Sequence, residues 1–341
     1  MKLATLNDGS RDGQLVVVSR DLMSAHYATG IADHMQHVLD DWNFLSPQLQ
    51  DLYDTLNHGK ARHAFAFEAR LCMAPLPRAY LMAVGDAYAR PAAHPAGPGS
   101  SAATAVPLRL AFADALLGAR APLSCAHAAQ LPDFEAAVAV VTGDVPQGAT
   151  PAQALDAVRL LTLANHTHYR AWQDQSALAL SAQPHTAFSP VAVTTDEFIR
   201  GDERAWRKGR LNLTLQCSVN GRKFGLCEAG RDMVTHFGEL LAHLCQTRRL
   251  RAGSIVSSGE VRSLDASHGC SSVATRRLLE LAQSGSNKTP WLAQGDSVLI
   301  DMKGPDGQSV FGAIDQDVQI GLQAVTPTPE DRASVRQLPS A

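Results

Sequence analysis

The chain has 341 residues, of which 45% are hydrophobic and 18% are charged, so it is long enough to bury a core in one large or two unequal domains. Its formal net charge is -3 and its basic residues are scattered, which argues against nucleic acid as the main partner. No apolar run approaches the roughly 18 to 20 residues that a membrane span requires, and residues 1–13 lack the apolar core of a signal peptide. We therefore expect a cytoplasmic protein with no membrane partner.

The cysteines support the same compartment. None forms a CxxC pair, and their scattered positions suit buried, reduced thiols better than disulfides or a structural zinc site. The six are Cys72, Cys125, Cys217, Cys227, Cys245 and Cys270.

The N-terminal part predicts a small α+β module over residues 1–74. Two apolar stretches flank the turn-rich NDGSRDG and indicate a β-hairpin. A helical region then runs to Gly59, with Ser46 and Pro47 expected as the N-cap and first residue of its main helix. The prolines of APLPRAY, residues 74–80, mark the junction to the next domain.

Residues 91–107 consist almost entirely of Pro, Ala, Gly, Ser and Thr, and we expect them to form a mobile loop. A strand is predicted around residues 134–142, and Thr150 with Pro151 predicts the start of a short helix. A further strand ends in LLTLANHTH.

The remaining segments predict more strands than helices. LNLTLQCSVNGRKFGLCEAG indicates a hairpin that turns at Asn220-Gly221, and RDMVTHFGELLAHLCQTRRL indicates an amphipathic helix. DSVLIDMKG and SVFGAIDQDVQI predict two final strands, and residues 327–341 a frayed tail. This pattern favours a mainly β (α+β) fold, a mixed β-sandwich roll over residues 75–326.

Glu135 is the most unusual residue of this pattern, because it lies within the apolar run of DFEAAVAVVTGDV. A desolvated carboxylate needs a cation, a metal or hydrogen-bond donors, or else a proton. A second acid two residues later would be its natural companion on the same strand face, but that position is Ala137.

The chain resembles the fumarylacetoacetate hydrolase family, in particular its bacterial two-domain members, almost from end to end. The stretches that carry the resemblance are MKLATLNDGSRDGQLVVVSRD, WNFLSPQLQDLYDTLNHGKARHAF, MAPLPRAY, DFEAAVAVVTGDV, TAFSPVAVT, LRAGSIVSSGEV and GQSVFGAIDQDV. The resemblance implies the β-roll fold and an enzyme that cleaves, decarboxylates, hydrates or isomerises keto acids around Mg²⁺, Mn²⁺ or Ca²⁺.

The resemblance also identifies four positions at which family members bind the metal through carboxylates. In this sequence they are Val84, Glu135, Ala137 and His166, so one acidic ligand of four remains. Asp86 is an alternative for the first of them. We therefore expect no divalent metal and no other cofactor.

Other site positions implied by the resemblance have changed as well. The water-activating His and its partner Glu fall at Pro91 and Thr275, with His94 an alternative for the former. A family Lys falls at Gln183, and a Thr that binds the substrate's carboxylate falls at Glu260, where an acid would repel that carboxylate.

The sequence yields a candidate site of seven residues. The expected catalytic residues are Glu135, His166 and Glu260, and the expected substrate-binding residues are Tyr88, His168, Gln183 and Thr275. Glu135, His166 and His168 also form a 2-His-1-carboxylate set, the alternative of a softer metal site. Cys270 is a weaker candidate nucleophile, and His236 and His243 are expected at structural or surface positions.

Three functions remain open at this point. The first is a repurposed, metal-independent enzyme that acts on a small carbonyl-bearing metabolite as an isomerase, cyclase, lyase or dehydratase. The second is a pseudoenzyme that serves as a binding or assembly subunit. The third is a hydrolase of 1,3-dicarbonyl acids with a rearranged metal site. A homodimer is expected, because members of the resembled family commonly form dimers.

Overall fold

The computed structural model of the chain describes residues 1–90, 108–173, 175, 181–200 and 203–321. The predicted mobile loop at 91–107 and the tail at 327–341 lie outside the described residues, as do Pro91 and His94.

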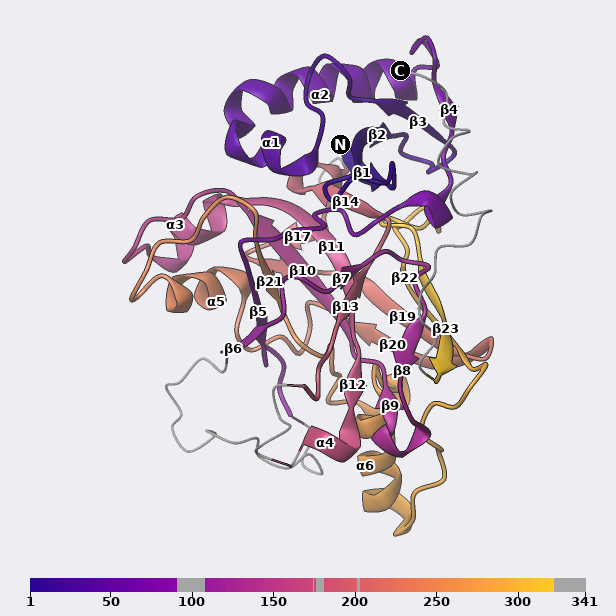
Figure 1. Cartoon of the computed structure of the whole chain (residues 1–341). Coiled ribbons are helices and arrows are strands. Elements are labelled where there is room, and N and C mark those ends of the chain that lie inside the picture. The colour runs from indigo at the N-terminus through magenta and orange to yellow at the C-terminus, as the bar shows by residue number, and fades with distance from the viewer. Residues whose placement is uncertain (91–107, 174, 176–180, 201–202, 322–341) are drawn as a thin grey trace.

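The N-terminal residues form the predicted hairpin and a helical cover. Strands β1 (Lys2–Leu6) and β2 (Gln14–Val18) are antiparallel, and β3 (Ser24–Tyr27) and β4 (Phe65–Ala66) extend them. Helices α1 (Met35–Asp40) and α2 (Trp42–Asn57) pack over these strands at the top of Figure 1.

Helix α2 begins earlier than the sequence predicts. Asp41 is its N-cap, and Pro47 lies inside the helix instead of starting it. The proline removes one backbone N–H, the one that would bond to the carbonyl of Asn43, an exposed residue. Leu45, Leu49 and Tyr53 are buried along one side, so packing overrides the local preference. The predicted stop is confirmed, since Gly59 follows the helix with φ +68°.

The main sheet continues from the N-terminal strands into the rest of the chain. Its order is β4-β3-β2-β1-β14-β11-β10-β21-β5-β6, because β1 also pairs with β14. The remaining members are β14 (Val191–Thr194), β11 (Val158–His166), β10 (Ala136–Thr142), β21 (Ser254–Ser257), β5 (Leu81–Gly85) and β6 (Leu108–Ala111), with β13 (Thr186–Phe188) and β7 (Leu116–Leu117) paired beside β11.

Both faces of this sheet are buried. Along β10 the even-numbered Ala136, Val138 and Val140 join one hydrophobic cluster, and the odd-numbered Ala137 and Ala139 join the other. The alternation follows from the two-residue period of a strand.

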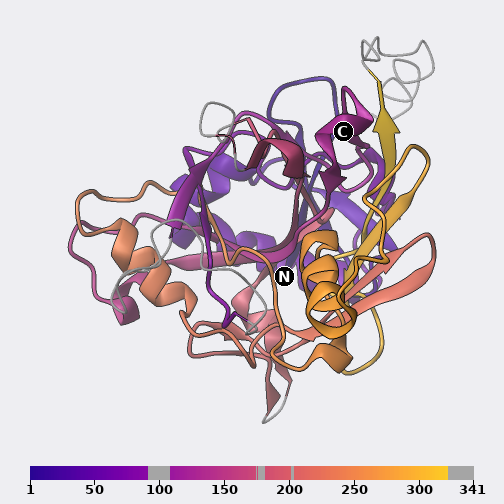
Figure 2. The ribbon, with the colours of Figure 1, turned by 90° about the horizontal axis from the view of Figure 1, so that it is seen from below.

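A second sheet completes the roll. Its strands, in order, are β20 (Arg222–Glu228), β19 (Thr214–Val219), β22 (Ser297–Met302), β23 (Ile314–Ile320) and β8 (Leu123–Cys125). The predicted turn is confirmed, since Asn220 and Gly221 both have positive φ between β19 and β20. Seen from below, β22 and β23 lie on the side of the roll opposite α5 (Figure 2).

Short elements complete the description. The two-residue strands pair as β9 (Pro132–Asp133) with β12 (His168–Tyr169), β15 (Ile199–Arg200) with β16 (Glu203–Arg204), and β17 (Trp206–Arg207) with β18 (Arg210–Leu211). The 3₁₀ helices are η1 (Ala69–Leu71), η2 (Ala128–Gln130), η3 (Thr195–Phe198) and η4 (Ala266–His268).

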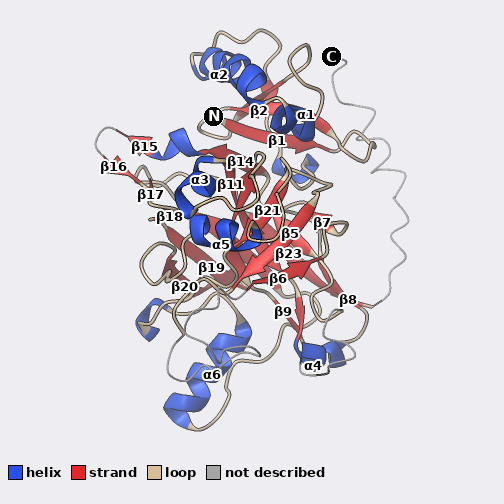
Figure 3. Ribbon diagram, turned by 90° about the vertical axis from the view of Figure 1, so that its left-hand side faces the viewer, coloured by secondary structure: helices blue, strands red, loops and turns tan. Residues whose placement is uncertain are grey.

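The helices of the roll lie outside its strands. Helix α3 (Pro151–Asp156) begins at the predicted cap, where the Thr150 side chain accepts from the Gln153 backbone N–H. It packs against α5 (Phe237–Leu244), which is shorter than the predicted amphipathic helix. Helices α4 (Arg170–Gln173) and α6 (Val273–Ser284) lie at the end away from α1 and α2 (Figures 1 and 3).

The architecture is therefore the mainly β, α+β roll that the sequence predicts. All six cysteines are buried and unbonded. Within the described residues, no helix combines the length and apolarity needed to cross a membrane.

Candidate functional site

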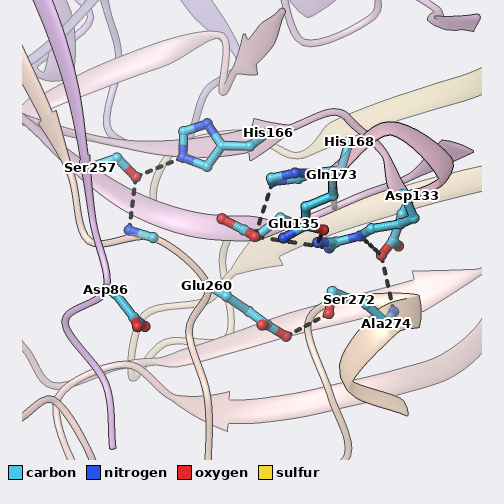
Figure 4. A network of polar contacts seen from close by, with 12 residues as sticks. Asp86, Asp133, Glu135, His166, His168, Gln173, Ser257, Glu260, Ser272 and Ala274 are labelled. Carbon is cyan, nitrogen blue, oxygen red and sulfur yellow. Dashed lines mark hydrogen bonds and ion pairs between the residues drawn. The ribbon is translucent and has the colours of Figure 1, made fainter. Parts of the chain in front are cut away.

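Glu135 lies just before β10, and its backbone bonds to two residues at the end of the neighbouring strand β11. Its N–H donates to the Asn165 side-chain oxygen at 3.0 Å, and its carbonyl accepts from the His166 N–H at 3.0 Å. The carboxylate lies 3.1 Å from His168 Nε2. Arg109 and Arg170 each place a guanidinium nitrogen 4.0 Å from it, Arg109 at Oε1 and Arg170 at Oε2. Figure 4 shows the contact with His168.

These neighbours decide the protonation state of Glu135. Burial alone would raise the pKa of its carboxyl, but His168, His166 and Arg109 together hold that pKa well below the ordinary value. Burial, followed by the charge of Arg170, lowers the pKa of His168 itself. At neutral pH we therefore assign an ionised Glu135 that faces a neutral imidazole and two guanidinium groups.

His166, an expected catalytic residue, does not contact the Glu135 carboxylate through its ring, since both ring nitrogens bond elsewhere. Its Nδ1 lies 2.9 Å from Thr186 Oγ1 and its Nε2 lies 2.8 Å from Ser257 Oγ. Burial lowers the pKa of His166 to about 3, so the ring is neutral. Both ring nitrogens are occupied by hydroxyl groups that belong to neighbouring strands.

The donor set does not fit the metal that the resemblance implies. Val84 and Ala137 are buried side chains without donor atoms, and His166 already bonds to two hydroxyl groups. Mg²⁺, Mn²⁺ and Ca²⁺ require several oxygen ligands, whereas this position supplies only Glu135. Across the described part of the chain, no three His, Cys, Asp or Glu residues are grouped as a metal would need, which includes the 2-His-1-carboxylate alternative.

Asp86, the alternative first ligand, is bound by two guanidinium groups. Arg90 Nε donates to it at 2.9 Å, and Arg262 contacts its other oxygen. Arg262 also lies 3.8 Å from Glu260, so a single guanidinium bridges two carboxylates. Figure 4 shows Asp86 and Glu260 on facing segments of the site.

Glu260 is held by hydroxyl groups of helix α6. Ser272 Oγ donates to one carboxylate oxygen at 2.6 Å, and Thr275 Oγ1 donates to the other at 2.9 Å. Burial raises the pKa of Glu260 and nearby Glu135 adds to this, although Arg262 opposes it. Thr275 was expected to bind substrate, but its hydroxyl group donates to Glu260 instead.

Asp133 anchors the start of α6. Its Oδ1 and Oδ2 accept from the N–H groups of Val273 and Ala274 at 2.8 and 3.0 Å. Arg170 Nε donates to the same carboxylate at 2.8 Å. The first N–H groups of the helix are satisfied in this way, and Arg170 is held between Asp133 and Glu135.

Gln183 and Tyr88, two further predicted substrate-binding residues, differ in their surroundings. Gln183 is 8% exposed, and neither its amide nitrogen nor its amide oxygen has a hydrogen-bond partner. Tyr88 instead lies in the hydrophobic core and donates to the Ala229 carbonyl at 2.6 Å, so the structure gives it a packing role in place of the expected ligand contact.

Cys270, a weaker candidate, and the helix residues His236 and His243 occupy structural or surface positions. Burial raises the pKa of the Cys270 thiol to about 12, which argues against a nucleophile. The His236 ring caps α5 by accepting from the Gly238 N–H, as its expected structural role implies, and His243 lies in the last turn of that helix.

Sequence reasoning missed Arg109, Arg170 and Ser257, and it considered Asp133 only as a possible ligand of a rearranged metal site. Arg170 and Asp133 had a usable signal, since each lies two residues from a predicted site residue, His168 and Glu135 respectively. Arg109 and Ser257 had none, because pairing of β5 with β6 and β21 brings them to the site.

The comparisons with known proteins are consistent with this architecture. The model of the fumarylacetoacetase N-terminal domain 2 matches residues 1–78, and the model of the fumarylacetoacetate hydrolase C-terminal domain matches residues 81–319. The chain belongs to the fumarylacetoacetate hydrolase family. No curated protein matches it.

Several solved structures resemble this member of the family. One is 2-hydroxyhepta-2,4-diene-1,7-dioate isomerase from Mycobacterium marinum, with a TM-score of 0.58, 17% identity, and coverage of 95% of this chain and 100% of that one. Maleylpyruvate hydrolase from Sphingobium sp. SYK-6, in complex with manganese(II) ion and pyruvate, gives 0.63 and 16%, with coverage of 94% and 100%. Fumarylacetoacetate hydrolase from Exiguobacterium antarcticum gives 0.62 and 16%, with coverage of 94% and 99%. At these identities the likeness shows the fold alone.

In this member of the family, guanidinium groups surround the site carboxylates. The carboxylates are Asp86, Asp133, Glu135 and Glu260, and the guanidinium groups are those of Arg90, Arg109, Arg170 and Arg262. Four carboxyl groups thus face four guanidinium groups, so the chain's own cations can offset the site's negative charge without a divalent ion.

We predict that Mn²⁺ does not stabilise the protein specifically, because Val84 and Ala137 carry no ligand atoms and His166 already bonds to two hydroxyl groups. Thermal unfolding of EDTA-treated protein should show the same midpoint with and without Mn²⁺. A saturable rise in the midpoint that Glu135→Gln removes would contradict the prediction.

A second prediction concerns Glu260 and pH. The pKa of Glu260 is raised in the folded state above its ordinary value of 4.5. Once the pH exceeds that value, Glu260 ionises in the unfolded chain but stays protonated in the folded protein, so folding becomes less favourable. This loss of stability grows until the pH passes the folded-state pKa. Glu260→Gln should therefore gain stability relative to the parent between pH 5 and pH 8. Urea denaturation at both pH values measures this difference, and a constant difference would refute the shift.

Proposed function

We propose that this protein is a metal-independent enzyme that transfers a proton next to the carbonyl group of a small metabolite, an isomerase-type reaction. The observation that carries the proposal is the environment of Glu135. Its carboxylate faces His168, Arg109 and Arg170 where the resemblance implies a metal with further acidic ligands. The positive charge at this position is thus supplied by the chain itself.

The two arginines are suited to bind a developing negative oxygen. Each stands 4.0 Å from Glu135, which is beyond hydrogen-bond distance, so each retains donor capacity. The Arg109 side chain is 45% exposed and donates no hydrogen bond to the described residues. A carbonyl oxygen that enters beside it would be polarised by guanidinium N–H groups, which stabilise an enolate electrostatically.

Glu135 is the proposed base. In the free protein the two imidazole rings and the Arg109 guanidinium group keep the pKa of Glu135 low, which makes it a weak base. A ligand oxygen that takes up part of the arginine charge removes this stabilisation, so the pKa of Glu135 rises on binding. The base would therefore be strengthened when substrate is present.

Glu260 is the proposed acid. The pKa of Glu260 is raised, whereas the pKa of Glu135 is lowered. Two carboxyl groups whose pKa values differ in this way suit opposite roles in proton transfer, one as acid and one as base. Glu135 would take a proton from the carbon beside the carbonyl, and Glu260 would return one at the far end of the enolate. One C–H bond is broken and one is formed. Proton exchange with water then returns Glu135 and Glu260 to their starting states, so no other co-reactant is needed.

Gln183 is the proposed contact for a polar group of the substrate. A buried amide with neither atom paired is costly, and a ligand hydroxyl or carbonyl would satisfy it. His168, predicted to bind substrate, would instead orient Glu135 through the 3.1 Å contact.

The comparisons support the proposal only at the level of the general enzyme class. The similar structures carry the names of isomerases and hydrolases, and at 15% to 17% identity they do not assign a reaction to this chain. The cyclase, lyase and dehydratase readings use the same proton-transfer groups. Hydrolysis at a rearranged metal site is disfavoured by the donor set. Homodimer formation and a cytoplasmic location remain proposals.

We predict that the protein accelerates hydrogen–deuterium exchange at the carbon between the carbonyls of acetopyruvate, a small 1,3-dicarbonyl acid, in the presence of EDTA. Proton NMR in D₂O follows the loss of signal. Glu135→Gln should lower the rate by about 10²- to 10⁴-fold, the usual effect of losing a general base. Glu228→Gln, which changes a half-exposed carboxylate paired with Arg231, is the matched control.

Three other results would overturn the proposal. Exchange that disappears with EDTA would favour a metal centre, and exchange unchanged in folded Glu135→Gln would place the base elsewhere. Binding of acetopyruvate without any exchange above buffer would favour the binding subunit.

A further inference from the structure

A pocket lies at the seam between the N-terminal strands and the roll, and it shares no lining residue with the network around Glu135. Its volume is about 290 Å³, near the lower end of the range for small-molecule sites. Lys2 and Arg20 border it from the N-terminal strands. Helix η3, the segment around residues 205–213 and the turn at 304–310 border it from the roll.

The wall of this seam pocket is largely apolar. Phe198, Ala205, Leu213, Pro305 and Val310 line it. Phe198 is itself fixed against Phe311, with ring centroids 5.8 Å apart. A compact hydrocarbon body is therefore the part of a ligand that would gain most by entering.

Arg20 gives the seam pocket a polar end. Its Nε and Nη2 lie 3.2 and 3.3 Å from the Glu197 carboxylate, which also lies 3.3 Å from the N-terminal ammonium group. Glu197 is thus neutralised from two sides. The Arg20 side chain is 53% exposed, and its contacts with Glu197 use Nε and Nη2. Its unused N–H groups are planar donors of the kind that bind carboxylates.

We propose that the seam pocket binds a small organic carboxylate about the size of benzoate. The apolar body would contact Phe198, Leu213 and Val310, and the carboxylate would accept from Arg20 Nη1. This proposal does not depend on the reaction at Glu135. Because the pocket is built from both the N-terminal strands and the roll, an occupant would also stabilise their association by mass action.

The test uses benzoate as the probe, cyclohexanecarboxylate as a second apolar acid, and benzamide as a neutral analogue. Isothermal titration of the full chain in EDTA should show saturable benzoate binding. Benzamide should bind at least about tenfold more weakly, since the charge-assisted contact is lost. Failure of both acids to bind into the millimolar range overturns the proposal.

Pocket-filling variants locate the binding. Ala205→Phe should abolish benzoate binding by occupying the cavity without removing an ion pair, and Val310→Phe is the second choice if the first variant does not fold. Ser46→Phe, in a separate pocket beside Trp42, is the matched control and should bind benzoate like the parent. Glu135→Gln should also keep the parental affinity. Benzoate affinity unchanged in a folded Ala205→Phe or Val310→Phe variant, or lost in Glu135→Gln, would contradict the assignment.

Discussion

The contact between Glu135 and its cationic and imidazole neighbours is the constraint on which the site depends. A buried carboxylate left without such partners costs several kcal/mol, and removing one partner of a buried ion pair typically costs about 3–5 kcal/mol. Here His168 meets the carboxylate at 3.1 Å, and two guanidinium groups stand on either side of it. The chain's own charges thus explain how Glu135 can be buried although Ala137 supplies no second acid on the same strand face.

Other features of the site follow from holding those charges in place. Arg170 is fixed by Asp133, and Asp133 is fixed by the first N–H groups of α6. Helix α6 in turn presents Ser272 and Thr275 to Glu260. Strand β20 and the segment before α6 lie close together here, because a Cβ at Gly225 would lie 2.1 Å from the Cys270 carbonyl oxygen. Packing between β20 and the segment before α6 therefore fixes the start of the helix that bonds to Glu260.

The sequence predicts local structure well where one residue type decides the outcome. Asn220-Gly221 supports the positive φ values of a tight hairpin, and Thr150 caps α3 through its own side chain. Prediction fails where packing prevails over local preference. Pro47 is accommodated inside α2 because that helix buries Leu45, Leu49 and Tyr53 against the sheet.

The candidate site shows the same division. The losses at Val84, Ala137 and His166 can be read from the sequence by the family resemblance, and so can the exceptional position of Glu135. What replaces the lost ligands cannot be read in this way. Arg109 comes from an edge strand that pairs with β5, and Ser257 reaches His166 only because β21 lies between β10 and β5. Such contacts depend on sheet order, which one sequence does not encode locally.

The most direct test of the account is the pKa of Glu135 in metal-free protein. Carbon-13 NMR of glutamate-labelled protein in EDTA, with the signal assigned from Glu135→Gln, reports this titration. The account predicts a pKa below the ordinary glutamate value of about 4.3, and a rise when Arg109→Gln removes one of the compensating charges. A Glu135 pKa above that value, falling only when Mn²⁺ is added, would contradict the claim that the chain's own cations have taken the place of the metal.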